Sequence, residues 1–188
     1  MCGIVGYVGH DNAKDIIIDG LKKLEYRGYD SAGIALLNKG KLTVRKRQGK
    51  IANLEAAIAS EHLFGTCGIG HTRWATHGAP SDVNAHPHIS SDNSVAIVHN
   101  GIVENYVELK EWLVKEHGLV FRTETDSEVI AQLLGVLIKT ENLSLEDAVF
   151  EAVKMMRGAY AIAAVTKDEP NRIVAYRKDA PLIAGLGK

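Results

Sequence analysis

The apolar residues of this chain alternate between short strand-like runs and longer stretches with helical spacing. Short runs rich in Ile, Val, Leu and Ala are typical of buried strands. They predict strands at residues 2–9, 32–37, 42–48, 66–75, 95–99, 158–166, 172–177 and 182–186. Apolar residues three and four positions apart predict helices at residues 11–26, 51–60, 103–117, 126–140 and 144–156. We expect Asp11 to cap the first of these helices.

The order of these segments favours an α+β fold. Two predicted strands flank the turn Asn38-Lys39-Gly40 as a hairpin, so we expect mainly antiparallel sheets with helices on their outer faces. Residues 76–93 form a long loop that contains Pro80 and Pro87, and loops of this length are commonly functional. Residues 1–188 suffice for one domain. The chain ends directly after a predicted strand, so we expect this domain to be truncated at its C-terminus.

Composition narrows the possible functions. The net charge is −1, with 46% hydrophobic and 24% charged residues, which indicates a globular protein without a basic field for nucleic acid. No apolar stretch reaches the roughly 18 residues of a membrane span, so we expect no membrane partner. Cys2 and Cys67 do not make a disulfide framework. These features fit a reducing compartment and a cytoplasmic protein.

The chemistry of the chain begins at Cys2, directly after the initiator methionine. Removal of Met1 would leave Cys2 with a free α-amine beside its thiol. A terminal amine has a pKa near ~7.7–8.0 and can act as a base in neutral water. The thiol would then be a nucleophile that carries its own base. The alternative is a small buried cysteine at the start of an apolar strand.

Histidines are concentrated in the middle of the chain, where a metal site has to be considered. Five of the eight lie between residues 71 and 99. We expect His86-Pro87-His88 to place its two imidazoles on opposite sides of an extended chain. No His-Glu-x-x-His and no Cys-x-x-Cys is present to complete a set of ligands. The spacing therefore does not favour a metal site, and we expect no metal and no cofactor.

Residues 70–78 combine several polar binding groups where a strand runs into the long loop. Arg73 can bind a carboxylate through two parallel hydrogen bonds. Thr76 and His77 can add donors beside it. The alternative is a solvated strand end with Trp74 packed on the core. The crowding of these side chains on one loop makes a binding site about as probable as that alternative.

Two further segments carry candidate polar groups. Asn100 offers an amide NH₂ and Gly101 a backbone N–H, a pair that can hold the oxyanion of a tetrahedral intermediate. Their alternative is a turn in which Asn100 caps a helix. Thr125 or Asp126 is expected to cap another helix, but Asp126 also suits a substrate ammonium. An arginine for a carboxylate and an aspartate for an ammonium indicate an amino-acid substrate.

Together these segments resemble the class II glutamine amidotransferases, whose glutaminase domains are N-terminal-nucleophile hydrolases. The motifs that carry the resemblance follow the family's order over two thirds of the chain. They are CGIVG at residues 2–6, LEYRGYDSAG at 24–33, HTRWATHG at 71–78, NAHPH at 84–88, VHNG at 98–101 and ETD at 124–126. The resemblance implies a four-layer α-β-β-α sandwich of two antiparallel sheets.

The resemblance also implies a reaction on L-glutamine. Cys2 would attack the side-chain amide, form a thioester and release ammonia, with its α-amine transferring the proton. The other implied roles fall into three groups. The oxyanion hole is formed by Asn100 and Gly101. Substrate contacts come from Arg73, Trp74, Thr76, His77, Gly101 and Asp126, with Trp74 and the loop after it covering the site. Supporting positions are Arg27, near the nucleophile, and His86, bracing the covering loop.

Within the family, the resemblance is to the branch that transfers the ammonia to a sugar phosphate. It implies a longer homo-oligomeric parent with C-terminal sugar isomerase domains, which these 188 residues lack. It also leaves one alternative open. If Met1 is retained, Cys2 has an amide nitrogen instead of an amine. The chain would then be an inactive glutamine-binding fragment.

Overall fold

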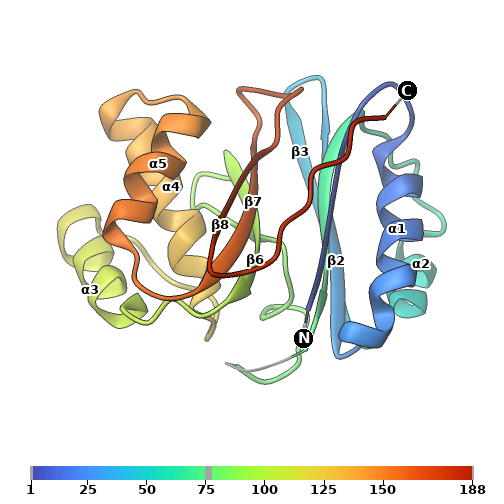
Figure 1. Cartoon of the computed structure of the whole chain (residues 1–188), viewed down its shortest axis with the longest axis horizontal. Coiled ribbons are helices and arrows are strands. Elements are labelled where there is room, and N and C mark those ends of the chain that lie inside the picture. Colours follow the sequence, from blue (N-terminus) through green and yellow to red (C-terminus); the bar gives the residue numbers. More distant parts are fainter. Residues whose placement is uncertain (1, 75–77, 188) are drawn as a thin grey trace.

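The computed structural model describes residues 2–74 and 78–187. Two antiparallel sheets pack face to face between two layers of helices (Figure 1). The first sheet has the order β1-β4-β2-β3, with β1 (Gly3–Val8), β2 (Ser31–Asn38), β3 (Lys41–Gln48) and β4 (Cys67–Arg73). The second has the order β5-β6-β7-β8, with β5 (His88–Ile89), β6 (Val95–Gly101), β7 (Tyr160–Thr166) and β8 (Val174–Lys178).

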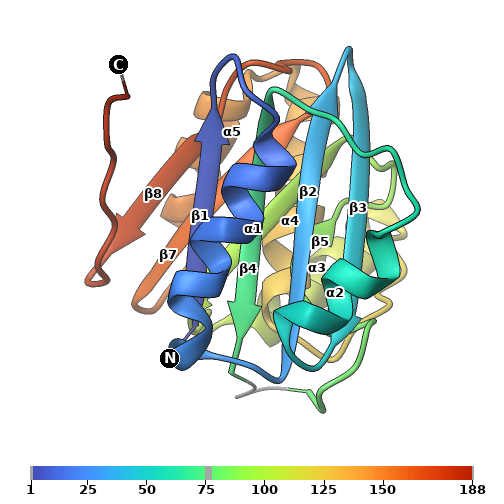
Figure 2. The ribbon, with the colours of Figure 1, turned by 90° about the vertical axis from the view of Figure 1, so that its right-hand side faces the viewer.

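The helices cover the outer faces of these sheets. Figure 2 shows the two helices that lie over the first sheet, α1 (Ala13–Leu24) and α2 (Ile51–Ile58). The second sheet is covered by α3 (Tyr106–His117), α4 (Ser127–Glu141) and α5 (Leu145–Met155). A short 3-10 helix, η1 (Glu25–Arg27), follows α1. The predicted four-layer α+β sandwich is therefore confirmed. No helix in the described part of the chain is long and apolar enough to cross a membrane.

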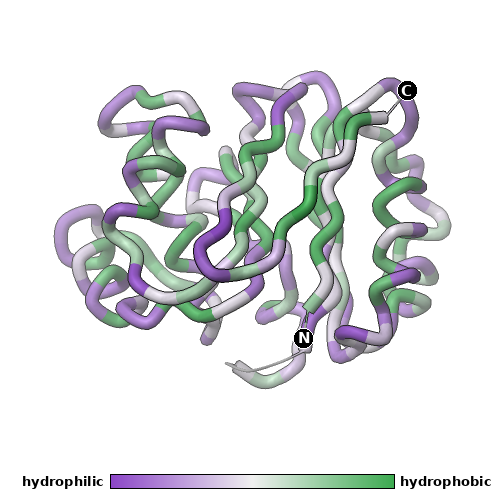
Figure 3. Tube along the Cα trace, in the orientation of Figure 1, coloured by the Kyte–Doolittle hydropathy of each residue, from purple (hydrophilic) through white to green (hydrophobic). Residues whose placement is uncertain are grey.

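Strand alternation divides the buried residues into three layers. Side chains two apart share one face of a strand. In β2, Ile34 and Leu36 pack against α1 and α2, whereas Ala35 and Leu37 face the second sheet. The layer between the sheets contains several small residues, among them Ala35, Ala96 and Ala163. Figure 3 shows hydrophobic residues along the central strands and hydrophilic residues mainly on the outer loops.

The same alternation positions the end of β4. Cys67 and Ile69 belong to the layer between the sheets, so His71 and Arg73 continue on that inner face. The residues between them in β4, Gly68 and Gly70, face α1. A Cβ at Gly70 would collide with the Ile17 side chain. In β6, Ala96 and Val98 belong to the inner layer, which brings Asn100 to the same side. Two polar strand ends thus meet between the sheets.

Several predicted boundaries need correction. Asn12, not Asp11, caps α1, because the Asn12 side chain accepts a hydrogen bond from the Lys14 N–H. α3 begins at Tyr106 and not at residue 103, because the N–H groups of Ile102 and Glu104 donate to carbonyl oxygens of Ala159 and Arg157, just before β7. Residues 182–186 are no strand, since they form no ladder with another described segment.

Gly33 provides a test of the close packing around β2. A Cβ at this position would lie 2.1 Å from the carbonyl oxygen of His86 and 2.9 Å from that of Arg45. We expect Gly33→Ala to lower the free energy of unfolding by about 2 kcal/mol or more, because backbone has to move. Urea denaturation measures the loss. Gly185→Ala is the matched control, because no atom lies within 4 Å of a Cβ there. Equal stability of the two variants would contradict the packing.

Candidate active site

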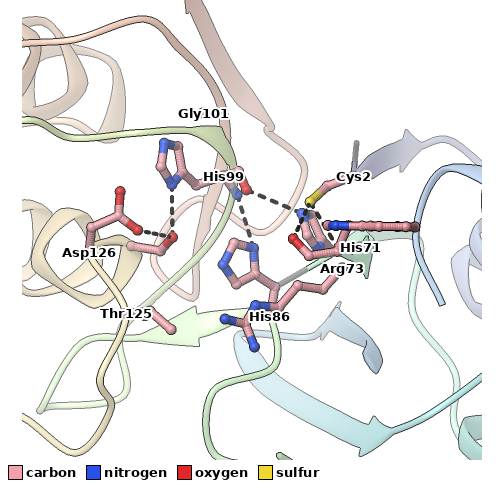
Figure 4. Close-up of a pocket in the computed structure, with 10 residues that line it drawn as sticks. Cys2, His71, Arg73, His86, His99, Gly101, Thr125 and Asp126 are labelled. Carbon is pink, nitrogen blue, oxygen red and sulfur yellow. Dashed lines mark hydrogen bonds between the residues drawn. The ribbon is translucent and has the colours of Figure 1, made fainter. Parts of the chain in front are cut away.

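A cavity lies where the start of β1 meets the ends of β4 and β6 and the start of α4 (Figure 4). Cys2 precedes β1, and Arg73 ends β4. Gly101 ends β6, and Asp126 immediately precedes α4. All four residues line this one cavity, although they are separated by up to 124 positions in the sequence. The topology therefore brings together four of the residues that the sequence predicted for the site.

The Cys2 thiol is held against the backbone of Trp74. The Trp74 N–H donates to Cys2 Sγ at 3.2 Å, and Sγ lies 3.6 Å from the Trp74 carbonyl oxygen. Burial raises the pKa of the Cys2 thiol, and the Trp74 N–H opposes this effect. Without further help the thiol is therefore protonated at neutral pH, so a nucleophilic role for Cys2 requires a base.

Asn100 connects Cys2 to the second sheet. Its Nδ2 donates to the Cys2 carbonyl oxygen at 3.3 Å, and its Oδ1 lies 2.9 Å from His71 Nε2. Asn100 therefore does not cap a helix. Gly101 has a φ of 118°, and a Cβ there would lie 2.2 Å from the Ala159 carbonyl oxygen. Only glycine suits this position, and Gly101 lines the cavity.

Arg73 and Asp126 place opposite charges around the same cavity, and both residues are buried. Arg73 Nη2 donates to the Gly78 carbonyl oxygen at 2.9 Å. Asp126 Oδ2 accepts the Val103 N–H at 2.8 Å. Asp126 stands at the cap position of α4, but its side chain makes no cap hydrogen bond. The expectation that Asp126 caps this helix is therefore wrong, because its carboxylate instead joins α4 to the segment after β6.

Thr125 does not cap α4 either. Its hydroxyl is paired with His88 Nε2 at 3.1 Å. Thr125 also lines the cavity, together with Ser127, whose hydroxyl lies 2.8 Å from His99 Nδ1. Both contacts tie the first residues of α4 to the buried histidines.

The remaining predicted residues occupy different positions. Trp74 is 48% exposed, and the centroid of its ring lies 5.5 Å from that of Tyr29. Trp74 therefore does not pack on the core. Thr76 and His77 lie outside the described residues. Arg27 belongs to η1 and does not line the cavity. The next residue, Gly28, packs directly on the Arg73 backbone.

His86 contacts strands in the described part of the chain. Its Nδ1 accepts the His99 N–H at 3.3 Å, and its ring centroid lies 4.1 Å from that of His71. These contacts place His86 beside the ends of β4 and β6. The bracing of the covering loop by His86 stays a prediction, because part of that loop lies outside the described residues. The expected separation of His86 and His88 is wrong. The centroids of their rings lie only 4.6 Å apart.

Comparison with known proteins identifies the family of this fold and cavity. Residues 71–183 match the family described as "Glutamine amidotransferase domain". The chain belongs to this family. The amidotransferase domain is 55% identical over 188 residues to glutamine–fructose-6-phosphate aminotransferase [isomerizing] of Clostridium perfringens. It is 54% identical to the enzyme of the same name from Aquifex aeolicus. It spans 30% and 31% of the lengths of these two relatives.

Solved structures confirm the fold of the amidotransferase domain. The glutamine phosphoribosylpyrophosphate amidotransferase of B. subtilis, complexed with ADP and GMP, superposes with a TM-score of 0.75. It is 32% identical, over 89% of this chain and 35% of the other. A structure described as the allosteric regulatory enzyme of purine biosynthesis has the same TM-score at 33% identity, over 89% of this chain and 36% of the other.

Four buried histidines lie at or beside the cavity, a grouping that the sequence analysis considered as a metal site and did not favour. They are His71, His86, His88 and His99. Burial lowers the pKa of each, to about 3 for His71, and the neighbouring Arg73 adds to the effect on His71, His86 and His88. Among the described residues no group of three His, Cys, Asp or Glu has the geometry of a metal site. In the amidotransferase domain these rings act as neutral hydrogen-bonding groups.

A second cavity of about 270 Å³ is lined in part by His88. Lys46 lines it and donates from Nζ to the Val83 carbonyl oxygen at 2.9 Å. Burial lowers the pKa of Lys46 to about 8. The buried carboxylate of Glu128 is fully occupied there by the N–H groups of Arg122 and Thr123 and by Gln132. The polar groups of Lys46 and Glu128 in this second cavity are thus already paired with the protein, so the candidate chemistry gathers in the smaller cavity beside Cys2.

The buried histidines predict how stability depends on pH. The unfolded chain binds protons on these rings below pH ~6.5, whereas the folded chain does not. We therefore expect the free energy of unfolding to fall as the pH drops below about 6.5. The slope is about 1.4 kcal/mol per pH unit for each histidine that stays neutral.

Urea denaturation between pH 5.5 and 8 measures this dependence. Replacing the exposed His62 by glutamine provides a control, because its ring takes no part in the buried cluster. A free energy of unfolding that stays constant from pH 7 to 5.5 would show that the four rings bind protons equally well in the folded chain.

Proposed function

We propose that this amidotransferase domain hydrolyses the side-chain amide of L-glutamine through a thioester on Cys2. The proposal rests on one observation. The Cys2 thiol, the buried guanidinium of Arg73 and the buried carboxylate of Asp126 all line the same cavity. An α-amino acid carries one carboxylate and one ammonium, which match the two charges. Glutamine adds a side-chain amide for the thiol to attack.

Substrate recognition follows from the two charges. Arg73 binds the α-carboxylate through its guanidinium, a group suited to two parallel hydrogen bonds. Asp126 binds the α-ammonium with the carboxylate that the Val103 N–H holds in place at 2.8 Å. We also propose Thr76 and His77, which follow Arg73 closely in the sequence, as further donors to the substrate. Trp74 borders the cavity with a half-exposed indole, and with the loop after it covers the bound substrate.

The reaction needs Cys2 as the first residue. Burial keeps its thiol protonated at neutral pH, and the α-amine exposed by loss of Met1 has the basicity to accept that proton. Sulfur then bonds to the amide carbon, and the C–N bond breaks as the amine returns the proton to the departing ammonia. Water attacks the resulting thioester, which releases glutamate and restores the thiol.

The tetrahedral intermediates need stabilisation of their oxyanion. Asn100 lies against Cys2 with its NH₂ facing the Cys2 carbonyl, and Gly101 lines the same cavity. We assign the oxyanion hole to these two donors. Arg27 keeps a supporting role, because the next residue, Gly28, packs on the backbone between Arg73 and Trp74. His86 supports the strand ends that carry the site.

The names of the relatives indicate where the ammonia goes. We propose that this domain delivers ammonia to fructose 6-phosphate to give glucosamine 6-phosphate, as the name glutamine–fructose-6-phosphate aminotransferase [isomerizing] suggests for its relatives. The partner would be a set of sugar isomerase domains in the same chain. We further propose a homo-oligomeric protein in the cytoplasm. The 50–55% identity over the whole chain to relatives of that name supports this assignment.

A second possibility concerns the state of the N-terminus. A chain that retains Met1 has an amide nitrogen on Cys2 and lacks the base. It still has Arg73 and Asp126, so it would bind glutamine without hydrolysing it.

The nucleophile is tested by Cys2→Ala. We expect glutamate release from glutamine to fall below detection in this variant, because no other residue supplies the thioester. An enzymatic glutamate assay measures the rate, and intact mass of the same sample shows whether Met1 is absent. A processed chain that stays equally active with alanine at position 2 would rule out the thioester.

The carboxylate partner is tested by Arg73→Lys. Lysine keeps the charge but cannot form two parallel hydrogen bonds, so we expect KM for glutamine to rise about 10- to 100-fold. Arg45→Lys is the matched control, because Arg45 pairs with Glu61 on the surface of β3. Steady-state kinetics give both values. A KM in Arg73→Lys as low as in Arg45→Lys would remove Arg73 from substrate binding.

A further inference from the structure

We propose that His71 is a positioning residue for the reaction, which sets the orientation of the Asn100 amide so that its NH₂ faces Cys2. This inference rests on the proposed glutaminase function and extends it to a residue that does not form the thioester. It assigns to His71 a role in the oxyanion hole through Asn100.

The position of His71 follows from the packing of the two sheets. His71 lies on β4 between Ile4 of β1 and Gly33 of β2, with its ring on the inner face. The ring crosses to the end of β6 in the other sheet. There Nε2 lies 3.1 Å from the His99 carbonyl oxygen and 2.9 Å from Asn100 Oδ1. One nitrogen of His71 thus joins the two sheets directly beside the nucleophile.

The hydrogen-bond partners determine which atom of His71 carries the proton. The His99 carbonyl oxygen can only accept a hydrogen bond, so Nε2 must be the protonated nitrogen. The Cys2 carbonyl can also only accept, so the NH₂ of Asn100 must face it and Oδ1 must face His71. These two arguments are independent, and they give the same arrangement. His71 Nε2–H donates, and Asn100 Oδ1 accepts.

This arrangement leaves one N–H of Asn100 for the reaction. An amide NH₂ carries two donors, and one of them is used by the Cys2 carbonyl at 3.3 Å. The second is available to an oxyanion formed at Cys2. If the amide turned by 180°, its oxygen would face Cys2 and would repel the developing negative charge. His71 prevents this reversal, because the reversed amide would place an N–H against the Nε2–H.

The ring itself is held firmly in its protonation state and orientation. His71 is 1% exposed, and its centroid lies 4.1 Å from that of His86. Burial lowers its pKa to about 3, so it remains neutral at physiological pH. Its Nδ1 is buried and has no hydrogen-bond partner among the described residues. The contacts of His71 therefore suit a fixed donor and not a proton relay.

Two amide substitutions separate the role of Nε2 from that of the rest of the ring. The amide of His71→Gln reaches about as far as Nε2 and can donate to Asn100, whereas the shorter amide of His71→Asn ends near the place of Nδ1. We expect His71→Gln to keep kcat within about tenfold of the unaltered chain. His71→Asn should lose kcat about 100-fold, the effect of removing one oxyanion donor. In both variants KM for glutamine and inhibition by glutamate should change by less than about threefold, because neither substitution touches Arg73 or Asp126.

A second comparison removes the effect of general destabilisation. In chains that carry Asn100→Ala, a further His71→Leu substitution should cost no additional kcat, because the group that His71 orients is already gone. In chains that retain Asn100, the same His71→Leu substitution should lower kcat about 100-fold. Thermal unfolding of every variant shows whether it is folded at the assay temperature.

The outcomes distinguish this inference from the proposed function. Glutamate release by the unaltered processed chain, and its loss in Cys2→Ala, tests the glutaminase activity independently of His71. With that activity present, equal kcat in His71→Gln and His71→Asn would overturn the positioning role. An undiminished effect of His71→Leu in the Asn100→Ala chain would overturn it as well, even if His71→Asn did not fold.

Discussion

The close approach of the two sheets is the constraint on which this site depends. Small residues such as Ala35, Ala96 and Ala163 lie in the layer between them, so the strands come near enough for side chains at their ends to bond across the layer. His71 of β4 then reaches Asn100 of β6 at 2.9 Å, and Asn100 reaches the residue before β1. Larger side chains in this layer would separate the hydrogen-bonding groups that surround Cys2.

Burial has opposite consequences for the polar groups that this packing encloses. It holds the histidines neutral, which lets them serve as hydrogen-bond donors and acceptors with defined directions. It also keeps the Cys2 thiol protonated, which makes a nearby base a requirement for nucleophilic attack. Arg73 and Asp126 are buried as charges, and a substrate with a carboxylate and an ammonium would neutralise both.

The sequence patterns predicted where helices and strands lie more accurately than they predicted the hydrogen bonds at the ends of these elements. The hairpin of β2 and β3 followed from alternation around a turn, and the pairing of Asn38 with Lys41 agrees. The cap of α1 was assigned to Asp11 instead of Asn12, because adjacent polar residues have similar cap preferences. Residues 182–186 have strand-like composition, but a strand also needs a partner, which the apolar pattern does not report.

The sequence by itself determined the types of chemical group available and most of the elements that carry them. Cys2, Arg73, Asn100, Gly101 and Asp126 were predicted as site residues from their chemistry and from a family resemblance. Only the tertiary structure decided that His71, weighed before as a metal ligand, contacts Asn100, and that Arg27 lies outside the cavity. The reason is physical. Every residue of β4 is buried, so its pattern does not show which side chains face the other sheet. That choice depends on how two sheets, built from distant parts of the chain, pack together.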